Sequence, residues 1–260
     1  MQYHWTLASV LHASRVGEKD KRLVLFSREM GKITAVAKGA AVPEAKWSSS
    51  FEPFSLLYLR LYERSRFLTV VSSEERIVYT DILSSLSRSL KGMAINQLLE
   101  CILEPSSEDP ELFAAYVTAL SRLNIASDSA GEDSVFLQFC LDVLANLGFG
   151  LSEFYCEACG TRIEGPAFFS LHDNSFRCSA CAVRSTDIAL SPELAAFLRT
   201  GRGTLDHRKT LAAIALILRL LKTAAGKLGV SSPFEQFAQN AATLFRTESY
   251  ETFKESDHEL

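Results

Sequence analysis

The sequence has no long hydrophobic run and no recognisable export signal. Its longest apolar stretch, LAAIALIL at 211–218, ends at Arg219, well short of the roughly 20 residues that a membrane-spanning helix needs. The start, MQYHWTLASVLHASR, lacks the basic segment and sustained apolar run of a secretory signal peptide. These absences predict a cytoplasmic protein with no membrane partner.

Motifs of common enzyme classes are also missing. The sequence contains no glycine-rich phosphate loop ending in Lys-Ser or Lys-Thr and no HExxH motif. The five histidines are dispersed, the acidic residues show no obvious pairing, and there is no internal repeat. We therefore expect a protein that is not an enzyme and has no small-molecule substrate.

The charge is unevenly distributed over a chain that has ample core material. With 260 residues and 47% apolar content, the chain can form one large domain or two modest ones. Residues 1–80 hold 12 Lys/Arg against 8 Asp/Glu, whereas the remaining 180 residues hold 15 against 23. A basic front and an acidic back suggest two parts with different partners, although ordinary scatter between domains gives a similar difference.

Four of the six cysteines have the spacing of a metal site. YCEACG at 155–160 and RCSACA at 177–182 form a C-x2-C-x18-C-x2-C pattern, which predicts tetrahedral zinc. Two residues between thiolates form a tight knuckle that aims both sulfurs at one ion. The candidate ligands are Cys156, Cys159, Cys178 and Cys181.

Four thiolates close the coordination shell of zinc, so the expected ion is structural, with one per chain. His172 lies between the pairs but is not needed as a ligand. The alternative is a set of redox or merely buried cysteines, although a redox Cys-x-x-Cys usually works alone. Cys101 and Cys140 lie in apolar helical contexts and are expected in the core.

Alternating apolar residues near the N-terminus predict strands at 3–11, 22–26, 32–39, 53–63 and 66–72. Five strands in about 75 residues leave no room for crossover helices between the first three, which favours a small antiparallel barrel of the OB-fold type. Helices are expected at 81–104, 107–123, 132–148, 191–201 and 207–229.

The predicted fold class is therefore α+β, with an N-terminal five-stranded OB-fold barrel followed by an α-helical domain. The helical domain carries a zinc-ribbon-like insertion with four cysteines. The expected boundaries are 1–80 for the barrel and 81–246 for the helical domain, with the zinc site at 155–182. An acidic tail at 247–260 is expected to be disordered.

The loops predicted to flank the barrel's binding face are rich in cations. Loops joining strands 1–2 and 4–5 flank that face in five-stranded barrels. Cations interleaved with aromatic rings suit single-stranded nucleic acid, because charges follow phosphates and rings stack on bases. Basic loops also serve solubility alone. The candidate contacts are Arg15, Lys19, Lys21, Arg22, Lys32, Lys38, Lys46, Arg64 and Arg66.

This order of parts resembles the RecO family of bacterial recombination mediators. FSREMGKITAVAKGA at 26–40 is similar to the family's hairpin ending in Ala-Lys-Gly-Ala, and FEPFSLLYLRLY at 51–62 to the following strand. LANLGFGLSEFYCEACG, FFSLHDNSFRCSACA and LSPELAAFLR follow the family's zinc region in order. The resemblance covers roughly residues 1–240.

The resemblance implies a non-enzymatic factor in DNA repair and homologous recombination. Such proteins bind single- and double-stranded DNA, anneal strands and interact with single-strand-binding protein. With RecR they help to load RecA on coated single strands, which implies a nucleoid-associated protein. Lys38 falls on the lysine of the family's turn, and the four cysteines on its zinc ligands. The chain departs from the family's basic run after that turn, reading AVPEAKW.

Two alternatives belong to other classes. One is a zinc-ribbon adaptor that acts through protein contacts only, and the other is a zinc-dependent nucleic-acid-modifying enzyme. Salt-sensitive binding of single strands by the N-terminal part would distinguish a DNA-binding repair factor from the adaptor. A metal held entirely by thiolates, with no exchangeable water, excludes the second.

Overall fold

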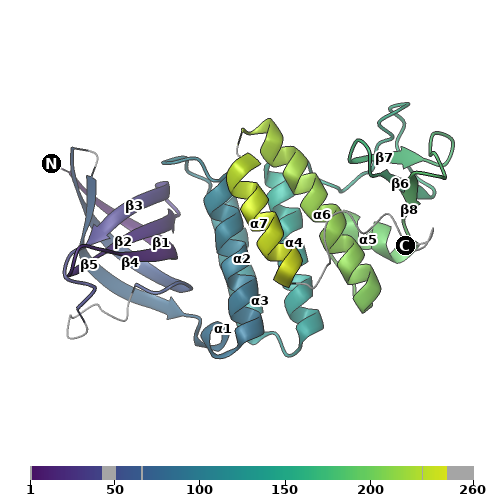
Figure 1. Ribbon diagram of the computed structural model, residues 1–260. Coiled ribbons are helices and arrows are strands. Elements are labelled where there is room, and N and C mark those ends of the chain that lie inside the picture. The colour runs from purple at the N-terminus through teal and green to yellow at the C-terminus, as the bar shows by residue number, and fades with distance from the viewer. Residues whose placement is uncertain (1, 43–50, 66, 230, 245–260) are drawn as a thin grey trace. The chain divides into compact units, whose positions relative to one another are not determined.

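A computed structural model describes residues 2–42, 51–65, 67–229 and 231–244 of the chain (Figure 1). The chain forms two compact units, Met1–Ala126 and Ser127–Leu260. The first unit contains a barrel and three helices, and the second contains helices and a small three-stranded sheet.

The first unit begins with a closed five-stranded barrel. Its strands are β1 (Gln2–Val16), β2 (Asp20–Ser27), β3 (Gly31–Ala37), β4 (Ser55–Arg64) and β5 (Phe67–Val78). Around the barrel the order is β1-β2-β3-β5-β4, and β4 closes it by pairing with β1. All pairs are antiparallel except β3 with β5. This is the architecture expected from the alternating sequence pattern.

The barrel interior is filled by side chains from alternate positions of each strand. On β3 these are Ile33, Ala35 and Ala37, and on β4 they are Leu57, Leu59 and Leu61. The small alanines allow β3 to lie close to its neighbours, while the leucines fill the remaining space. Because successive side chains point to opposite faces, the residues between them lie on the outer surface of the barrel.

Strands β1 and β2 are longer than the sequence predicted. Pairing continues through Ser14↔Arg22 and Arg15↔Lys21, so the connecting turn contains only residues 17–19. The polar character of residues 12–22 predicts a loop there, and that prediction is wrong over most of the segment. Outward-facing positions of a barrel are solvated, and polar side chains there are compatible with a strand.

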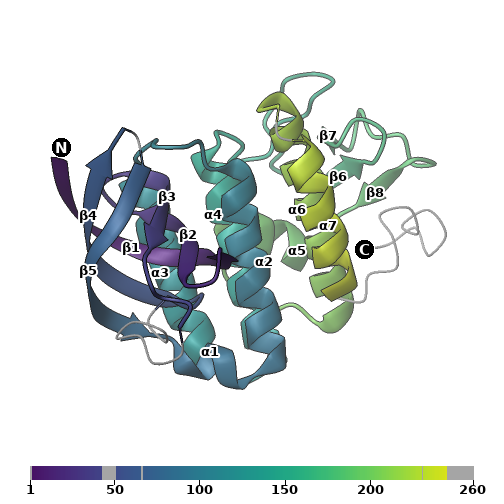
Figure 2. The same ribbon diagram turned by 60° about the vertical axis from the view of Figure 1, so that its left-hand side comes forward.

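Three helices complete the first unit: α1 (Thr80–Ser84), α2 (Leu86–Ile102) and α3 (Pro110–Ile125). The prediction of one helix over 81–104 is wrong at Ser85, whose backbone is extended and whose hydroxyl accepts a hydrogen bond from the Arg88 amide. Serine competes for backbone hydrogen bonds in this way and is favoured as an N-cap. The helix expected at 107–123 begins at Pro110, with Asp109 as its N-cap. Figure 2 shows α2 and α3 beside the barrel from a second direction.

A buried hydrogen-bond network joins these helices to the barrel. The Tyr116 hydroxyl donates to Asn96 Oδ1 at 2.8 Å and lies 3.1 Å from the Ser9 hydroxyl. Asn96 Nδ2 in turn donates to the carbonyl of Leu11 at 3.0 Å. Buried polar groups are tolerated when they are paired, so this network fixes α2 and α3 against β1.

Gly31, at the start of β3, occupies a position that excludes a side chain. Its φ is 64°, and a Cβ would collide with the backbone of Ser107. We expect Gly31→Ala to lower the free energy of unfolding by about 2–5 kcal/mol, because overpacking adds to the cost of a left-handed backbone.

Gly17→Ala is the matched control for this prediction. Gly17 has a similar φ of 63°, but no atom lies within 4 Å of its would-be Cβ. The Gly17→Ala variant should lose only about 1–2 kcal/mol of its free energy of unfolding. Urea unfolding of both variants measures the difference, and equal losses would contradict the close approach of Ser107 to the turn.

The second unit combines helices with a small sheet. Helices α4 (Ser129–Asn146), α5 (Pro192–Thr200), α6 (His207–Lys227) and α7 (Ser231–Leu244) make up its helical part, and α6 packs against the other three. Helix α7 was not predicted from the sequence. The sheet has the order β7-β6-β8, formed by Ser175–Cys178, Ala167–Ser170 and Asp187–Ala189.

The α+β fold class, with an N-terminal barrel, a helical part and a cysteine cluster, is confirmed. The division into two units falls after Ala126, whereas the predicted boundary at residue 80 marks the end of the barrel and stays a prediction. The tail at 247–260 lies outside the described residues. Within the described ranges, no helix is both long enough and apolar enough to cross a membrane.

Candidate metal centre and nucleic-acid interface

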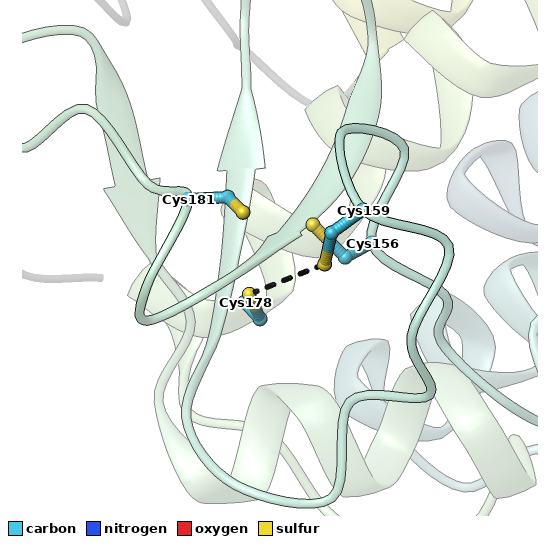
Figure 3. Close-up of side chains that lie close together, drawn as sticks. All are labelled: Cys156, Cys159, Cys178 and Cys181. Atoms are coloured by element: carbon cyan, nitrogen blue, oxygen red, sulfur yellow. Dashed lines mark hydrogen bonds between the residues drawn. The ribbon is translucent and has the colours of Figure 1, made fainter.

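The four predicted cysteines come together in the second unit. Their sulfur atoms all lie within 4.8 Å of one another, and the sulfurs of Cys159 and Cys178 are 3.9 Å apart. Figure 3 shows the four side chains pointing toward a common centre, with Cys156 and Cys159 on one loop and Cys178 and Cys181 beside the end of β7.

Tight backbone turns aim each pair of sulfurs. In the first pair, the amide of Gly160 donates to the carbonyl of Cys156 at 2.7 Å, and Gly160 has a φ of 70°. Glycine adopts this left-handed conformation at little cost. In the second pair, the amide of Cys181 donates to the carbonyl of Cys178 at 3.1 Å. The two-residue spacing therefore forms the tight turn that was expected from the sequence, with both sulfurs of a pair directed at one point.

An aromatic cluster packs next to the two cysteine turns. Phe154 stacks on Phe176 with ring centroids 4.2 Å apart, and Phe169 meets Phe176 edge-on at 5.4 Å. The guanidinium of Arg199, on α5, lies 4.4 Å from the centre of the Phe154 ring. The amide of Glu157 donates to the carbonyl of Phe176, which ties the first turn to β7. This packing holds the two cysteine pairs at a fixed separation.

Hydrogen bonds shape the ionisation of the thiols. Burial raises the pKa of Cys156, but backbone hydrogen bonds at Cys178, Cys159 and Ala158, together with the Cys159 side chain, outweigh it and lower the pKa to about 6. The pKa of Cys181 is raised to about 12, because its thiol shares hydrogen bonds with the other three sulfurs. A cation at the centre would replace these shared protons, since metals bind the thiolate form.

The donor set fits a tetrahedral metal ion. Four sulfurs at about 2.3 Å from one zinc ion lie about 3.8 Å from one another, close to the observed separation of Cys159 and Cys178. Among the described residues this cluster includes no histidine, so His172 is not part of it. Cys101 and Cys140 are buried elsewhere, as predicted, and burial raises the pKa of both thiols.

In the first unit, two turns bring predicted cations together at one end of the barrel. The amide of Ala41, after β3, donates to the carbonyl of Lys19 in the β1–β2 turn at 2.9 Å. Arg15 Nη2 donates to the carbonyl of Ala41 at 3.0 Å. Arg15, Lys19 and Lys38 are exposed, and two acids lie with them: Glu18 in the same turn, and Asp20, whose Oδ1 accepts a hydrogen bond from the Gly39 amide at 2.8 Å. A cationic cluster therefore forms where β2 begins and β3 ends.

A groove of about 430 Å³ lies on the outer face of β2 and β3. Arg22 lies toward the cationic cluster, since it pairs with Val36 near the end of β3. Lys32 is half-buried and donates from Nζ to the carbonyl of Glu100 at 2.8 Å. Burial lowers the pKa of Lys32, and Glu100 partly opposes this shift. The lining also includes Thr34, Leu68 and Ser106, which sequence reasoning missed.

The remaining predicted cations differ in availability. Lys21 is 14% exposed and forms an ion pair with Glu52 at 2.7 Å, so its charge is already partnered. Arg64 is exposed at the end of β4, opposite Phe67 in the β4–β5 hairpin. Lys46 and Arg66 lie outside the described residues.

The sequence did contain a signal for Thr34, the groove residue that was missed. Thr34 alternates with Ile33 and Ala35, which are buried, and this alternation places Thr34 on the outer face of the strand.

A closed barrel, a helical part and a four-thiol cluster together define a recognisable class of protein. Residues 1–77 match the family profile described as "Recombination protein O N terminal", and residues 83–225 match "Recombination protein O C terminal". The chain belongs to the RecO family.

Several curated relatives carry the name "DNA repair protein RecO". The protein from Desulfitobacterium hafniense (strain DSM 10664 / DCB-2) is 28% identical over 184 residues, 70% of this chain and 66% of that protein. The Shigella flexneri protein is 30% identical over 161 residues, 62% of this chain and 65% of its own length. The chain therefore aligns with slightly less than two thirds of these relatives.

Proposed function

We propose that this protein is a DNA repair and homologous recombination factor that binds single- and double-stranded DNA through its barrel. The observation that carries the proposal is the groove on β2 and β3, which joins a cluster of exposed cations at one end of the barrel. Within the described part of the chain, no ion pair holds the charged groups of Lys19, Arg22 or Lys38. Such cations are available to replace the counterions of a phosphate backbone.

The half-buried Lys32 supports the same proposal. Burial disfavours its charged form, as the lowered pKa shows. A phosphate in the groove would favour that charged form, because an opposite charge nearby offsets desolvation. The acid Glu100 also lines the groove and already offsets part of this desolvation, so a phosphate would add to its effect on Lys32.

The proposed role of the cysteine cluster is structural. Zn²⁺ is the ion that best fits four thiolates in tight turns, and it would cross-link two segments of the second unit. Cys156, Cys159, Cys178 and Cys181 would be its only ligands, which leaves no position for a reacting water. The proposal is accordingly a protein that is not an enzyme and has no small-molecule substrate.

The proposed partners follow from membership of the RecO family. The protein would anneal complementary strands and, with RecR, help to load RecA on DNA coated by single-strand-binding protein. It would therefore act at the nucleoid. A zinc-ribbon adaptor working through protein contacts alone, the alternative, would not bind naked DNA.

Annealing of complementary single strands tests this function. We expect the full chain to accelerate annealing of strands coated with the cognate single-strand-binding protein, and RecR to modify the rate. A variant with Lys19, Arg22 and Lys38 changed to Ala should lose most of the acceleration, because the charges that hold two strands together are removed. Annealing rates measured with fluorescently labelled strands report the result.

The control variant changes Arg122, Arg184 and Arg202 to Ala. These three arginines are also exposed and removing them alters the net charge equally, but none of them lines the groove or belongs to its turns. It should anneal at the rate of the unmodified protein. A wild-type chain that neither binds naked strands nor anneals them, while still binding its protein partners, would favour the adaptor.

A further inference from the structure

The outer face of β1 and β4 carries an array of aromatic rings that is separate from the β2–β3 groove. Cross-strand pairing sets Tyr3 opposite Tyr62 and Trp5 opposite Arg60. The rings of Tyr3 and Tyr62 have centroids 5.3 Å apart, and Trp5 stacks on Tyr58 with centroids 5.4 Å apart and planes inclined by 21°. Two strands thus present one continuous aromatic surface.

The two β1 rings remain open to solvent. Tyr3 and Trp5 are each 53% exposed, although both already contact a neighbouring ring. Aromatic pairs across a sheet contribute about 0.2–1 kcal/mol to its stability, and that contribution does not require an exposed ring. Exposed, rigid rings side by side are the feature on which nucleobases stack, because every base has a π-face.

Arg60 adds an incomplete polar site between these rings. Its guanidinium lies 4.3 Å from the centre of the Tyr3 ring and 5.5 Å from that of Trp5. Its Nε is buried and has no hydrogen-bond partner among the described residues. The guanidinium carries four further N–H groups on its two terminal nitrogens, and an acceptor that reached these would form charge-assisted hydrogen bonds. Phosphate oxygens and base carbonyls are such acceptors.

The surrounding charges favour a nucleic acid over an apolar protein segment. Arg64 follows Arg60 by four residues on β4, which places it on the same outer face, and it is exposed. The carboxylate of the nearby Glu63 forms a hydrogen bond with the His4 ring, and Glu63 Oε2 lies 2.8 Å from His4 Nε2. Glu74, an exposed acid on β5, pairs with Tyr58 in register and therefore lies beside the array, next to the ring on which Trp5 stacks.

We propose that Tyr3, Trp5 and Arg60 form a platform on which bases of single-stranded DNA stack. This inference rests on the proposed function and deepens it, because it adds a base-contacting surface to the phosphate-contacting groove. Paired bases in a duplex are stacked on one another and do not reach the platform. The platform therefore distinguishes single strands from double strands.

Fluorescence of Trp5 tests the contact directly. The chain has two tryptophans, so Trp47→Phe leaves Trp5 as the only one. Titration of this full-length variant with a thymidine oligonucleotide should quench its emission, and the quenching should saturate together with binding measured by anisotropy of the labelled strand. Duplex DNA should bind without quenching.

Substitutions at Trp5 separate stacking from packing. Trp5→Leu keeps an apolar side chain but removes the ring, and should weaken single-strand binding about 5- to 150-fold. Trp5→Phe keeps a ring and should retain most of the affinity. Neither variant should alter duplex binding or the slope of log affinity against log salt, because stacking releases no counterions. Circular dichroism melting checks that both variants fold.

Three results would overturn the inference. Single-strand binding with unchanged Trp5 emission would leave the proposed function standing and remove the platform. Emission that changes with protein concentration in the absence of DNA would assign this face to a second copy of the chain. Absence of binding to either form of DNA would overturn the proposed function and the platform together.

Discussion

Cys156→Ser should release the metal and destabilise the second unit. Cys156 is the most buried of the four candidate ligands, with 1% of its surface exposed, and its thiolate is the one most strongly favoured by backbone hydrogen bonds. Structural zinc contributes folding energy directly, so we expect a loss of about 4 kcal/mol or more. Metal analysis of purified protein and urea unfolding measure the two effects.

The control for this variant is His172→Ala. His172 lies between the cysteine pairs and is exposed, so removing it should change neither metal content nor stability. Lowering the pH should release the metal from the unmodified protein, since protons compete for the thiolates. A Cys156→Ser protein with full metal content, or a metal-free wild type of equal stability, would contradict the structural role of the cluster.

The gathering of the four cysteines could be predicted almost completely from the sequence. The Cys-x-x-Cys spacing and Gly160 specify the local turns, and these depend on few distant residues. No comparable local signal marks the hairpin of β6 and β7, which joins the second pair to the first. That hairpin depends on Phe154 and Phe176, residues 22 positions apart that meet only in the folded unit.

The barrel was predictable because alternation along five strands is a strong local signal. Whether each cation is exposed or already paired could not be predicted, because this depends on contacts between residues that are distant in sequence. Lys21 is neutralised by Glu52, and Lys32 donates to the carbonyl of Glu100; neither partner is close in sequence. The break at Ser85 was missed for another reason, since the apolar spacing on both sides of it is helical.

Removal of the three available cations at the groove should weaken DNA binding strongly. Lys19, Arg22 and Lys38 are exposed and lie along the cationic turns and the groove. If each contacts one phosphate, their replacement by Ala lowers affinity for a single strand about 100-fold at 0.1 M salt. Affinity for duplex DNA should fall as well, because both forms present phosphates. The arginine control, which removes equal charge elsewhere, should bind like the unmodified protein.

The salt dependence of single-strand binding by the full chain tests the central claim most directly. Affinity should fall linearly on a plot of log affinity against log salt, and the groove variant should flatten the slope by about 2, from roughly 0.7 per lost contact. The arginine control should keep the slope of the unmodified protein. Equal slopes for all three proteins would place the phosphate contacts outside this face of the barrel, and a slope of zero for the unmodified protein would contradict DNA binding itself.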